Sequence, residues 1–297
     1  MKDDGAPPSV AGGAGQEVAA AAWSVPAEIA GLQLSVRCAP DRTRSRAPDD
    51  SYELLQLASG RWGIAVIDMK ARARNRPGQS GKLGPPPVSA ETTGAIGMAR
   101  AGLHSAAQVE SSPGQVLASF SRWLHGMPPV GSCFFTAFYA TVRPSVIGAL
   151  VRICAAGMQT VYLRRADGSV LVVPQQETFL GLSSDSELRE ERLLLRPGDS
   201  LILVTGSVTG ADRTSSGSAW LARVMADLGS MSAARTAEVV LNAVRERRGV
   251  RADDKTIVLV LKMPSHRRGS GTHSAGWPGA RRYPEITPSS GWPWRWR

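Results

Sequence analysis

The central two-thirds of the chain alternates between short apolar runs and turn-forming residues. The runs Tyr52–Leu57 and Trp62–Ile67 are separated by Ala58-Ser59-Gly60, which predicts a β-hairpin. Similar runs predict strands at Gln33–Arg37, Phe134–Val142, Leu150–Ala155, Val161–Arg164, Val170–Val173, Leu193–Leu195, Leu201–Thr205 and Thr256–Lys262. Longer segments predict helices at Ala90–Ala107, Pro113–Leu124, Ser218–Leu228 and Ala233–Arg247. Sequential strands with tight turns, and helices in groups, indicate an α+β fold built on antiparallel sheets.

The two ends of the chain differ from this centre. Residues 1–22 are rich in Gly, Ala, Pro and Ser, and residues 264–297 in Gly, Ser, Pro and Arg, so neither end has much apolar surface to bury. We expect both ends to be disordered and to flank one globular domain at residues 23–263.

Several classes of protein are excluded by what the sequence lacks. No apolar run approaches the roughly 18 residues needed to cross a bilayer, and the start is a poor secretory signal. The three cysteines, Cys38, Cys133 and Cys154, show no paired metal spacing and suit a reducing compartment. These features predict a cytoplasmic protein without a membrane span, a disulfide framework or a zinc site.

The net charge of +10 comes from two segments. Residues 37–82 hold ten Lys/Arg against five Asp/Glu, and residues 264–297 hold six Arg against one Glu. Basic segments can attract phosphorylated protein, nucleic acid or an anionic surface, or can simply be solvated. The second segment interleaves Arg with four of the eight tryptophans, an arrangement that could stack on bases. No helix-turn-helix, zinc-finger or RNP-like pattern accompanies them, so nucleic acid is not the expected partner.

The candidate chemistry lies with aspartates at strand ends. The four histidines fall in no metal or triad spacing, and neither a nucleophile elbow nor a Walker loop is present. Asp68 ends an apolar strand, Asp50 precedes the strand predicted to pair with it, and Asp253 precedes the closing strand. Carboxylates held at strand ends suit hard cations, which prefer oxygen ligands. Taken singly, each could equally be a turn aspartate that faces water.

Five blocks carry a resemblance to a known family, in order, over roughly residues 26–263. They are Pro48–Tyr52, Gly60–Asp68, Phe135–Ala140, Leu195–Thr205 and Asp253–Val260. Their order and spacing resemble PPM-type protein serine/threonine phosphatases of the bacterial SpoIIE/RsbU-like branch. The resemblance implies a four-layer αββα sandwich of two antiparallel sheets flanked by helices. It also implies a two-metal site, with Mn²⁺ or Mg²⁺, where metal-activated water hydrolyses phosphoserine or phosphothreonine.

The resemblance also assigns roles to particular residues. Asp50, Asp68 and Asp253 match metal-ligand positions of the family, and the implied partner is a phosphorylated or regulatory protein of the anti-sigma-antagonist type. The pattern fails where Gly206 stands in place of a ligand aspartate, and whether Asp212 substitutes for it stays open. It fails again where alanines at 71 and 73 replace glycines, and in Gly157–Thr160, where the family has a histidine.

Three retained aspartates favour residual metal binding and three damaged motifs favour lost catalysis, so two functions stay open. Lys70 and Arg72 follow Asp68 closely, and they could repel a metal or contact a phosphate directly. One reading is a weak or impaired metal-dependent phosphatase. The other is a catalytically inactive pseudophosphatase that binds a phosphoprotein as a regulatory module.

Overall fold

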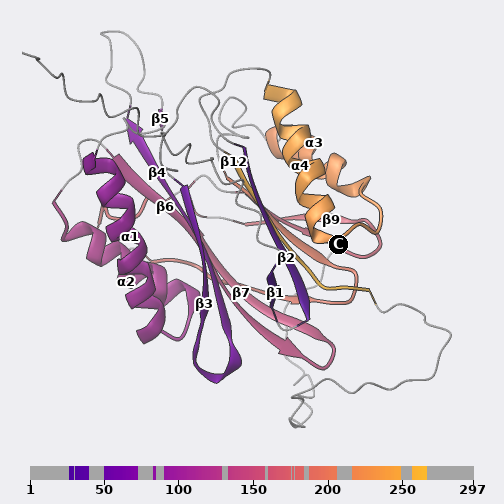
Figure 1. Ribbon diagram of the computed structural model, residues 1–297, viewed down its shortest axis with the longest axis horizontal. Coiled ribbons are helices and arrows are strands. Elements are labelled where there is room, and N and C mark those ends of the chain that lie inside the picture. The colour runs from indigo at the N-terminus through magenta and orange to yellow at the C-terminus, as the bar shows by residue number, and fades with distance from the viewer. Residues whose placement is uncertain are drawn as a thin grey trace, which may run out of the picture. The chain divides into compact units, whose positions relative to one another are not determined.

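Two antiparallel sheets pack face to face in the computed structural model of the protein (Figure 1). The structure describes residues 27–29, 31–39, 50–72, 83–84, 90–128, 133–157, 160–174, 176, 178–183, 187–205, 216–248 and 256–265. The ends predicted to be disordered lie outside the described residues, except for Pro264 and Ser265.

Each sheet has six strands. Sheet A has the order β1 (Ala27–Ile29), β2 (Leu32–Ala39), β12 (Thr256–Lys262), β11 (Ser200–Val204), β8 (Thr160–Arg164) and β9 (Val170–Val173). Sheet B has the order β10 (Glu191–Leu195), β7 (Gly148–Ala156), β6 (Cys133–Ser145), β4 (Trp62–Arg72) and β3 (Asp50–Gln56), with β5 (Leu83–Gly84) paired to β4. A short 3-10 turn, η1 (Ala58–Gly60), joins β3 to β4.

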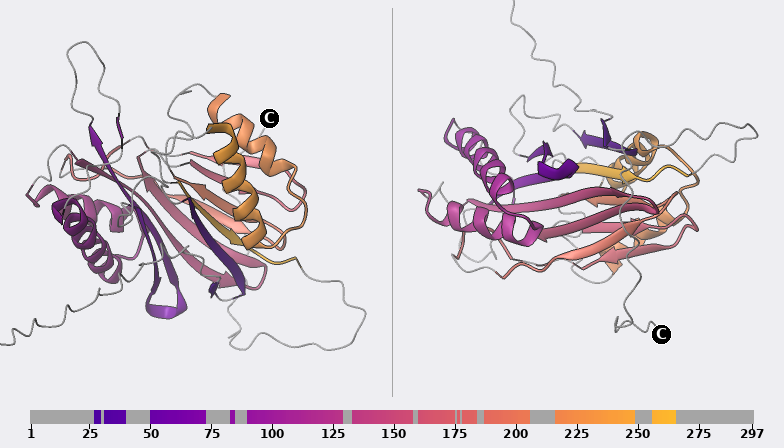
Figure 2. Two further views of the ribbon diagram at one scale, coloured as in Figure 1. Left: turned by 45° about the horizontal axis from the view of Figure 1, so that its top comes forward. Right: turned by 90° about the horizontal axis from the view of Figure 1, so that it is seen from below.

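Helices cover the outer face of each sheet and complete four layers (Figures 1 and 2). On sheet B lie α1 (Ala90–Val109) and α2 (Pro113–His125), and on sheet A lie α3 (Ser216–Ala226) and α4 (Ala233–Arg248). Alternation along β4 explains the layering, because Ile64 and Val66 face sheet A while Ala65 and Ile67 face the helices. The structure therefore confirms the α+β fold and the αββα sandwich expected from the sequence.

The predicted elements are confirmed with small differences at their ends. The strand expected at Trp62–Ile67 runs on to Arg72, because residues 68–71 continue to pair with β6 and the last two residues pair with β5. β1 and β5 were not expected, since three and two residues are too few to show a period. Ser112 caps the start of α2: Gln115 N donates to Ser112 Oγ at 3.4 Å, and proline opens the helix.

Two expectations about the chain's chemistry are also met. All three cysteines are free thiols, and burial raises the pKa of Cys154 to about 12, so this thiol behaves as a small apolar residue. Among the described residues, no helix combines the length and apolar character that a membrane span requires.

Candidate metal site

Asp68 lies near the end of β4, on the face that packs against sheet A. It continues the inward series of Ile64 and Val66 by strand alternation. Its side chain is only 3% exposed. Its Oδ1 is buried and has no hydrogen-bond partner among the described residues. A buried carboxylate oxygen without a partner is costly, so the position calls for a cation or a donor.

A polar row crosses sheet B at Asp68. Asp50 on β3 lies directly opposite it on one side, and Thr136 on β6 lies opposite on the other. Thr136 Oγ1 donates to the Asp68 carbonyl at 3.5 Å, in a region where Thr136 is 1% exposed. The sheet therefore fixes the backbone of Asp68 and places two acidic residues in register. The hairpin of β3 and β4 was predicted from the sequence, and the structure adds that Asp50 lies directly opposite Asp68.

Lys70 contacts Asp68 directly. The Lys70 Nζ lies 2.8 Å from Asp68 Oδ2, and the lysine side chain is 14% exposed. The two residues are separated by one position in a strand, so they share a face. The sequence analysis predicts that Lys70 repels a metal or contacts a phosphate, and it does not predict this ion pair. The spacing of two residues within a strand could have predicted it, because such residues share a face.

In sheet A, the end of β11 and the start of β12 lie next to each other, and the remaining candidate metal-ligand positions follow or precede these strand ends. Thr205 follows β11, is fully buried, and accepts a hydrogen bond at its Oγ1 from Ile257 N of β12 at 2.8 Å. Gly206 follows Thr205, and Asp253 precedes β12 by a few residues, but both lie outside the described residues, as does Asp212. In Figure 1 the end of β4 and the start of β12 lie at the same end of the sandwich.

Two positions in the blocks that depart from the family pattern lie within the described residues. Ala71, where the family has glycine, lies in β4 opposite Gly84 of β5, so the backbone is an extended strand there. Gly157, which follows β7, has φ of +110°, and a Cβ there would meet the side chain of Thr136. The sequence analysis names Gly157 only as part of the segment where the family has a histidine, and it does not predict the close approach of Gly157 to Thr136. The side chains of Arg72 and Asp50, and all of Ala73, lie outside the description.

The described residues at this end of the sandwich fit a hard cation at Asp68. The partnerless Asp68 Oδ1 suits a cation, and Asp50 stands in register beside it. The other oxygen, Oδ2, already binds the Lys70 ammonium. Among the described residues no three Asp, Glu, His or Cys side chains gather as a metal cluster, and Asp253 lies outside that set.

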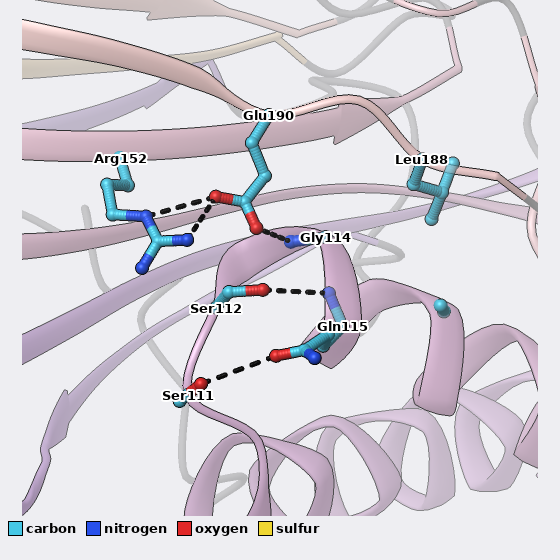
Figure 3. Close-up of a pocket in the computed structure, with 8 residues that line it drawn as sticks. Ser111, Ser112, Gly114, Gln115, Arg152, Leu188 and Glu190 are labelled. Carbon is cyan, nitrogen blue, oxygen red and sulfur yellow. Dashed lines mark hydrogen bonds and ion pairs between the residues drawn. The ribbon is translucent and has the colours of Figure 1, made fainter.

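A separate open pocket of about 420 Å³ lies at the start of α2 (Figure 3). Glu190 accepts hydrogen bonds there from Arg152, at 2.7 and 3.0 Å, and from the backbone N of Gly114 at 3.2 Å. Arg152 lies on the helix-facing side of β7, because it shares a face with Cys154 and alternates with Val151 and Ile153 of the inner face. The pocket therefore lies across sheet B from Asp68. Glu190 already occupies the start of the helix, where a carboxylate is stabilised by the helix dipole.

The lowered pKa of Glu190 predicts that the stability of the fold depends on pH. Burial acts to raise the pKa of its carboxyl, but hydrogen bonds from Ser112, Arg152 and Gly114 outweigh burial and hold the pKa below the ordinary glutamate value. A depressed pKa stabilises the fold above the unfolded-state pKa, and this contribution is lost as pH falls through the folded-state value. We expect Glu190→Gln to cost about 1 kcal/mol of unfolding free energy at neutral pH, and less in acid. Urea unfolding at several pH values measures it.

The control for this experiment is Glu238→Gln. Glu238 pairs with Arg235 on the surface of α4, with about half of its side chain exposed. We expect a loss below about 0.5 kcal/mol for this control. Parallel pH profiles for wild type and Glu190→Gln would show that Glu190 is not the titrating group.

Comparison with known proteins identifies the family. The model of Stage II sporulation protein E (SpoIIE) matches residues 90–263, more than half of the 297-residue chain. The search of curated proteins finds no match.

Solved structures show the same fold at low identity. The RsbU and RsbW domains of a Mycobacterium tuberculosis protein superpose with a TM-score of 0.61 at 18% identity, covering 82% of this chain and 64% of that one. The SpoIIE phosphatase domain of Bacillus subtilis gives 0.55 at 16%, covering 82% and 98%. RsbX in complex with magnesium gives 0.53 at 11%, covering 77% and 94%. The chain thus spans just under two-thirds of the first of these. With the family model over most of the sandwich, the chain belongs to the SpoIIE family of PPM-type phosphatase domains.

Proposed function

We propose that this chain is a metal-dependent protein serine/threonine phosphatase with weak or impaired activity. The observation that carries the proposal is Asp68, a buried carboxylate with one partnerless oxygen, held in register with Asp50. A phosphomonoester dianion repels an attacking water, so a site for this reaction must neutralise charge. Divalent cations, when bound, supply that neutralisation and activate water.

The chain's own residues would do the holding and the positioning. Asp68 would offer its Oδ1 to a Mn²⁺ or Mg²⁺ ion, with Asp50 beside it and Asp253 contributed from the other sheet. Thr136 would keep the Asp68 backbone in place through its hydrogen bond to the carbonyl. Lys70 or Arg72 could contact the substrate phosphate. Gly206 supplies no ligand, which would lower metal affinity and account for reduced turnover.

The Lys70–Asp68 ion pair favours a second candidate. An ammonium 2.8 Å from Asp68 Oδ2 already neutralises the carboxylate that the metal needs. A chain in this state could bind a phosphoprotein without hydrolysing it, as a pseudophosphatase. In either case we expect the partner to be a phosphorylated regulatory protein in the cytoplasm, in keeping with the RsbU and RsbW domains joined in one similar structure.

Hydrolysis of an aryl phosphate with Mn²⁺ separates the two candidates. We expect slow Mn²⁺-dependent turnover in the wild type, none in Asp68→Asn, and an increase of about tenfold or more in Gly206→Asp, which restores a ligand. Asp167→Asn, in an exposed turn, is the matched control and should match the wild type. Turnover confined to Gly206→Asp would establish the pseudophosphatase. A complete lack of both turnover and metal binding in all variants would refute the metal site itself.

A further inference from the structure

We infer that Lys70 is a built-in competitor for the divalent cation at Asp68, so that metal binds only by displacing its ammonium group. The inference rests on the proposed function, since it takes Asp68 as a metal ligand. In the metal-free protein Asp68 forms an ion pair with Lys70, and a metal must break this ion pair in order to bind.

The backbone fixes Lys70 over Asp68. Both residues lie in β4, where Asp68 pairs with Thr136 and Lys70 pairs with Phe134 of β6. Lys70 therefore lies on a paired strand, two residues from Asp68, and its side chain is on the same face as the Asp68 carboxylate. Displacing the ammonium group moves the lysine side chain and can leave the pairing of β4 with β6 as it is.

Burial makes the competition strong. The Asp68 and Lys70 side chains are 3% and 14% exposed, so water screens neither charge well. A divalent cation at Asp68 would be repelled by an ammonium group bonded to the same carboxylate. Lys70 must therefore leave before the cation can bind closely, and the broken ion pair subtracts from the free energy of metal binding.

Only one of the two oxygens of the Asp68 carboxylate has a partner among the described residues. Lys70 satisfies Oδ2, while Oδ1 stays buried and without a partner among the described residues. A monovalent ammonium neutralises the charge of Asp68 and leaves half of its acceptor capacity unmet. A hard cation of higher charge could use the second oxygen as well, which is why the pair is displaceable rather than permanent.

Calorimetric titration of the full chain with Mn²⁺ tests the inference. We expect Lys70→Met to bind Mn²⁺ about ten- to a hundredfold more tightly than the wild type, because the competing charge is gone. Lys70→Arg, which keeps the charge, should stay near the wild-type affinity. Arg100→Met is the matched control, since it removes a cation 2.6 Å from Glu53 on the helix-facing side of the same sheet, and it should leave Mn²⁺ affinity unchanged.

Thermal unfolding gives a second measurement that does not depend on activity. In EDTA, Lys70→Met and Lys70→Gln should unfold at lower temperature than the wild type, because Asp68 is left as an uncompensated buried charge. Saturating Mn²⁺ should raise their midpoints more than that of the wild type, and should raise the midpoint of Asp68→Asn not at all.

The outcomes separate this inference from the proposed function. Equal, measurable Mn²⁺ affinity in wild type and Lys70→Met would overturn the competition and leave the metal-dependent phosphatase standing. Binding in Lys70→Met alone would support the competition and refute metal-dependent turnover by the native chain. Binding in neither would overturn both.

Discussion

Asp199→Ala is expected to lower the free energy of unfolding by about 3–5 kcal/mol, the largest stability loss that the structure predicts. Asp199 closes the turn between β10 and β11 and is 2% exposed. Its carboxylate accepts from Arg196 N and Ala166 N, both at 3.0 Å, and from the Arg165 guanidinium at 2.8 Å. Alanine would leave two backbone donors without their acceptor and would remove the carboxylate partner of Arg165, whose guanidinium would keep only its hydrogen bond to the Leu194 carbonyl among the described residues.

The same turn also joins distant parts of sheet A. Met263 N donates to the Asp199 carbonyl at 3.0 Å, and Gly198 N donates to the Met263 carbonyl at 2.8 Å, so the turn is tied to the end of β12. Loss of the carboxylate should therefore affect β8, β11 and β12 together and unfold the domain cooperatively, without a separate local transition.

Urea unfolding followed by circular dichroism measures this loss, with Asp167→Ala as the control. Asp167 lies in the neighbouring turn, and the hydrogen bonds that its side chain accepts within the described part of the chain come from Ser169 of that turn. Its replacement should leave the midpoint of unfolding close to that of the wild type. If the two variants lost equal stability, the network around Asp199 would not be the source of the effect.

Apolar runs of strand length between turn-forming residues explain why most of the fold could be predicted from the sequence. Runs such as Thr256–Lys262 are buried throughout and bounded by turn residues, so their state is set locally. The opposition of Asp50 and Asp68 follows similarly from a hairpin whose turn, η1, is visible in the sequence. β1 and β5 could not be predicted, because each exists only through pairing with a longer strand.

The candidate site was less predictable, because its contacts join distant segments. Lys70 lies close to Asp68 in the sequence, but whether it pairs with Asp68 or contacts a phosphate depends on how deeply both side chains are buried, which the sequence does not show. The approach of Gly157 to Thr136 depends on how the chain leaves β7, which no local pattern specifies. The blocks that resemble the family predict where the site lies. What such a site can do depends on the residues that stand in place of the family's glycines and aspartate, and these include Gly206, which has no side chain to offer.

Gly157→Ala is expected to cost about 2–4 kcal/mol of unfolding free energy and to act at the edge of the candidate site. At φ of +110° an L side chain is strained, and an added Cβ would lie 2.5 Å from Thr136 Cβ and closer still to its methyl group. Gly157 N is also fixed by a hydrogen bond to the Gln176 carbonyl at 2.9 Å, so the segment cannot simply move away. Thr136 would have to shift, and it holds the backbone of Asp68.

A double-mutant cycle with Thr136→Ser isolates that contact. Serine keeps the hydroxyl that reaches Asp68 but removes the methyl group that the new Cβ meets first. We therefore expect Thr136→Ser to recover part of the stability lost in Gly157→Ala, giving a favourable coupling of about 1 kcal/mol in urea unfolding. Gly229→Ala, at an exposed glycine with open space around it, is the control and should be nearly neutral. Strict additivity of the two substitutions would place the cost of Gly157→Ala in its backbone alone, and would separate Gly157 from the positioning of Asp68.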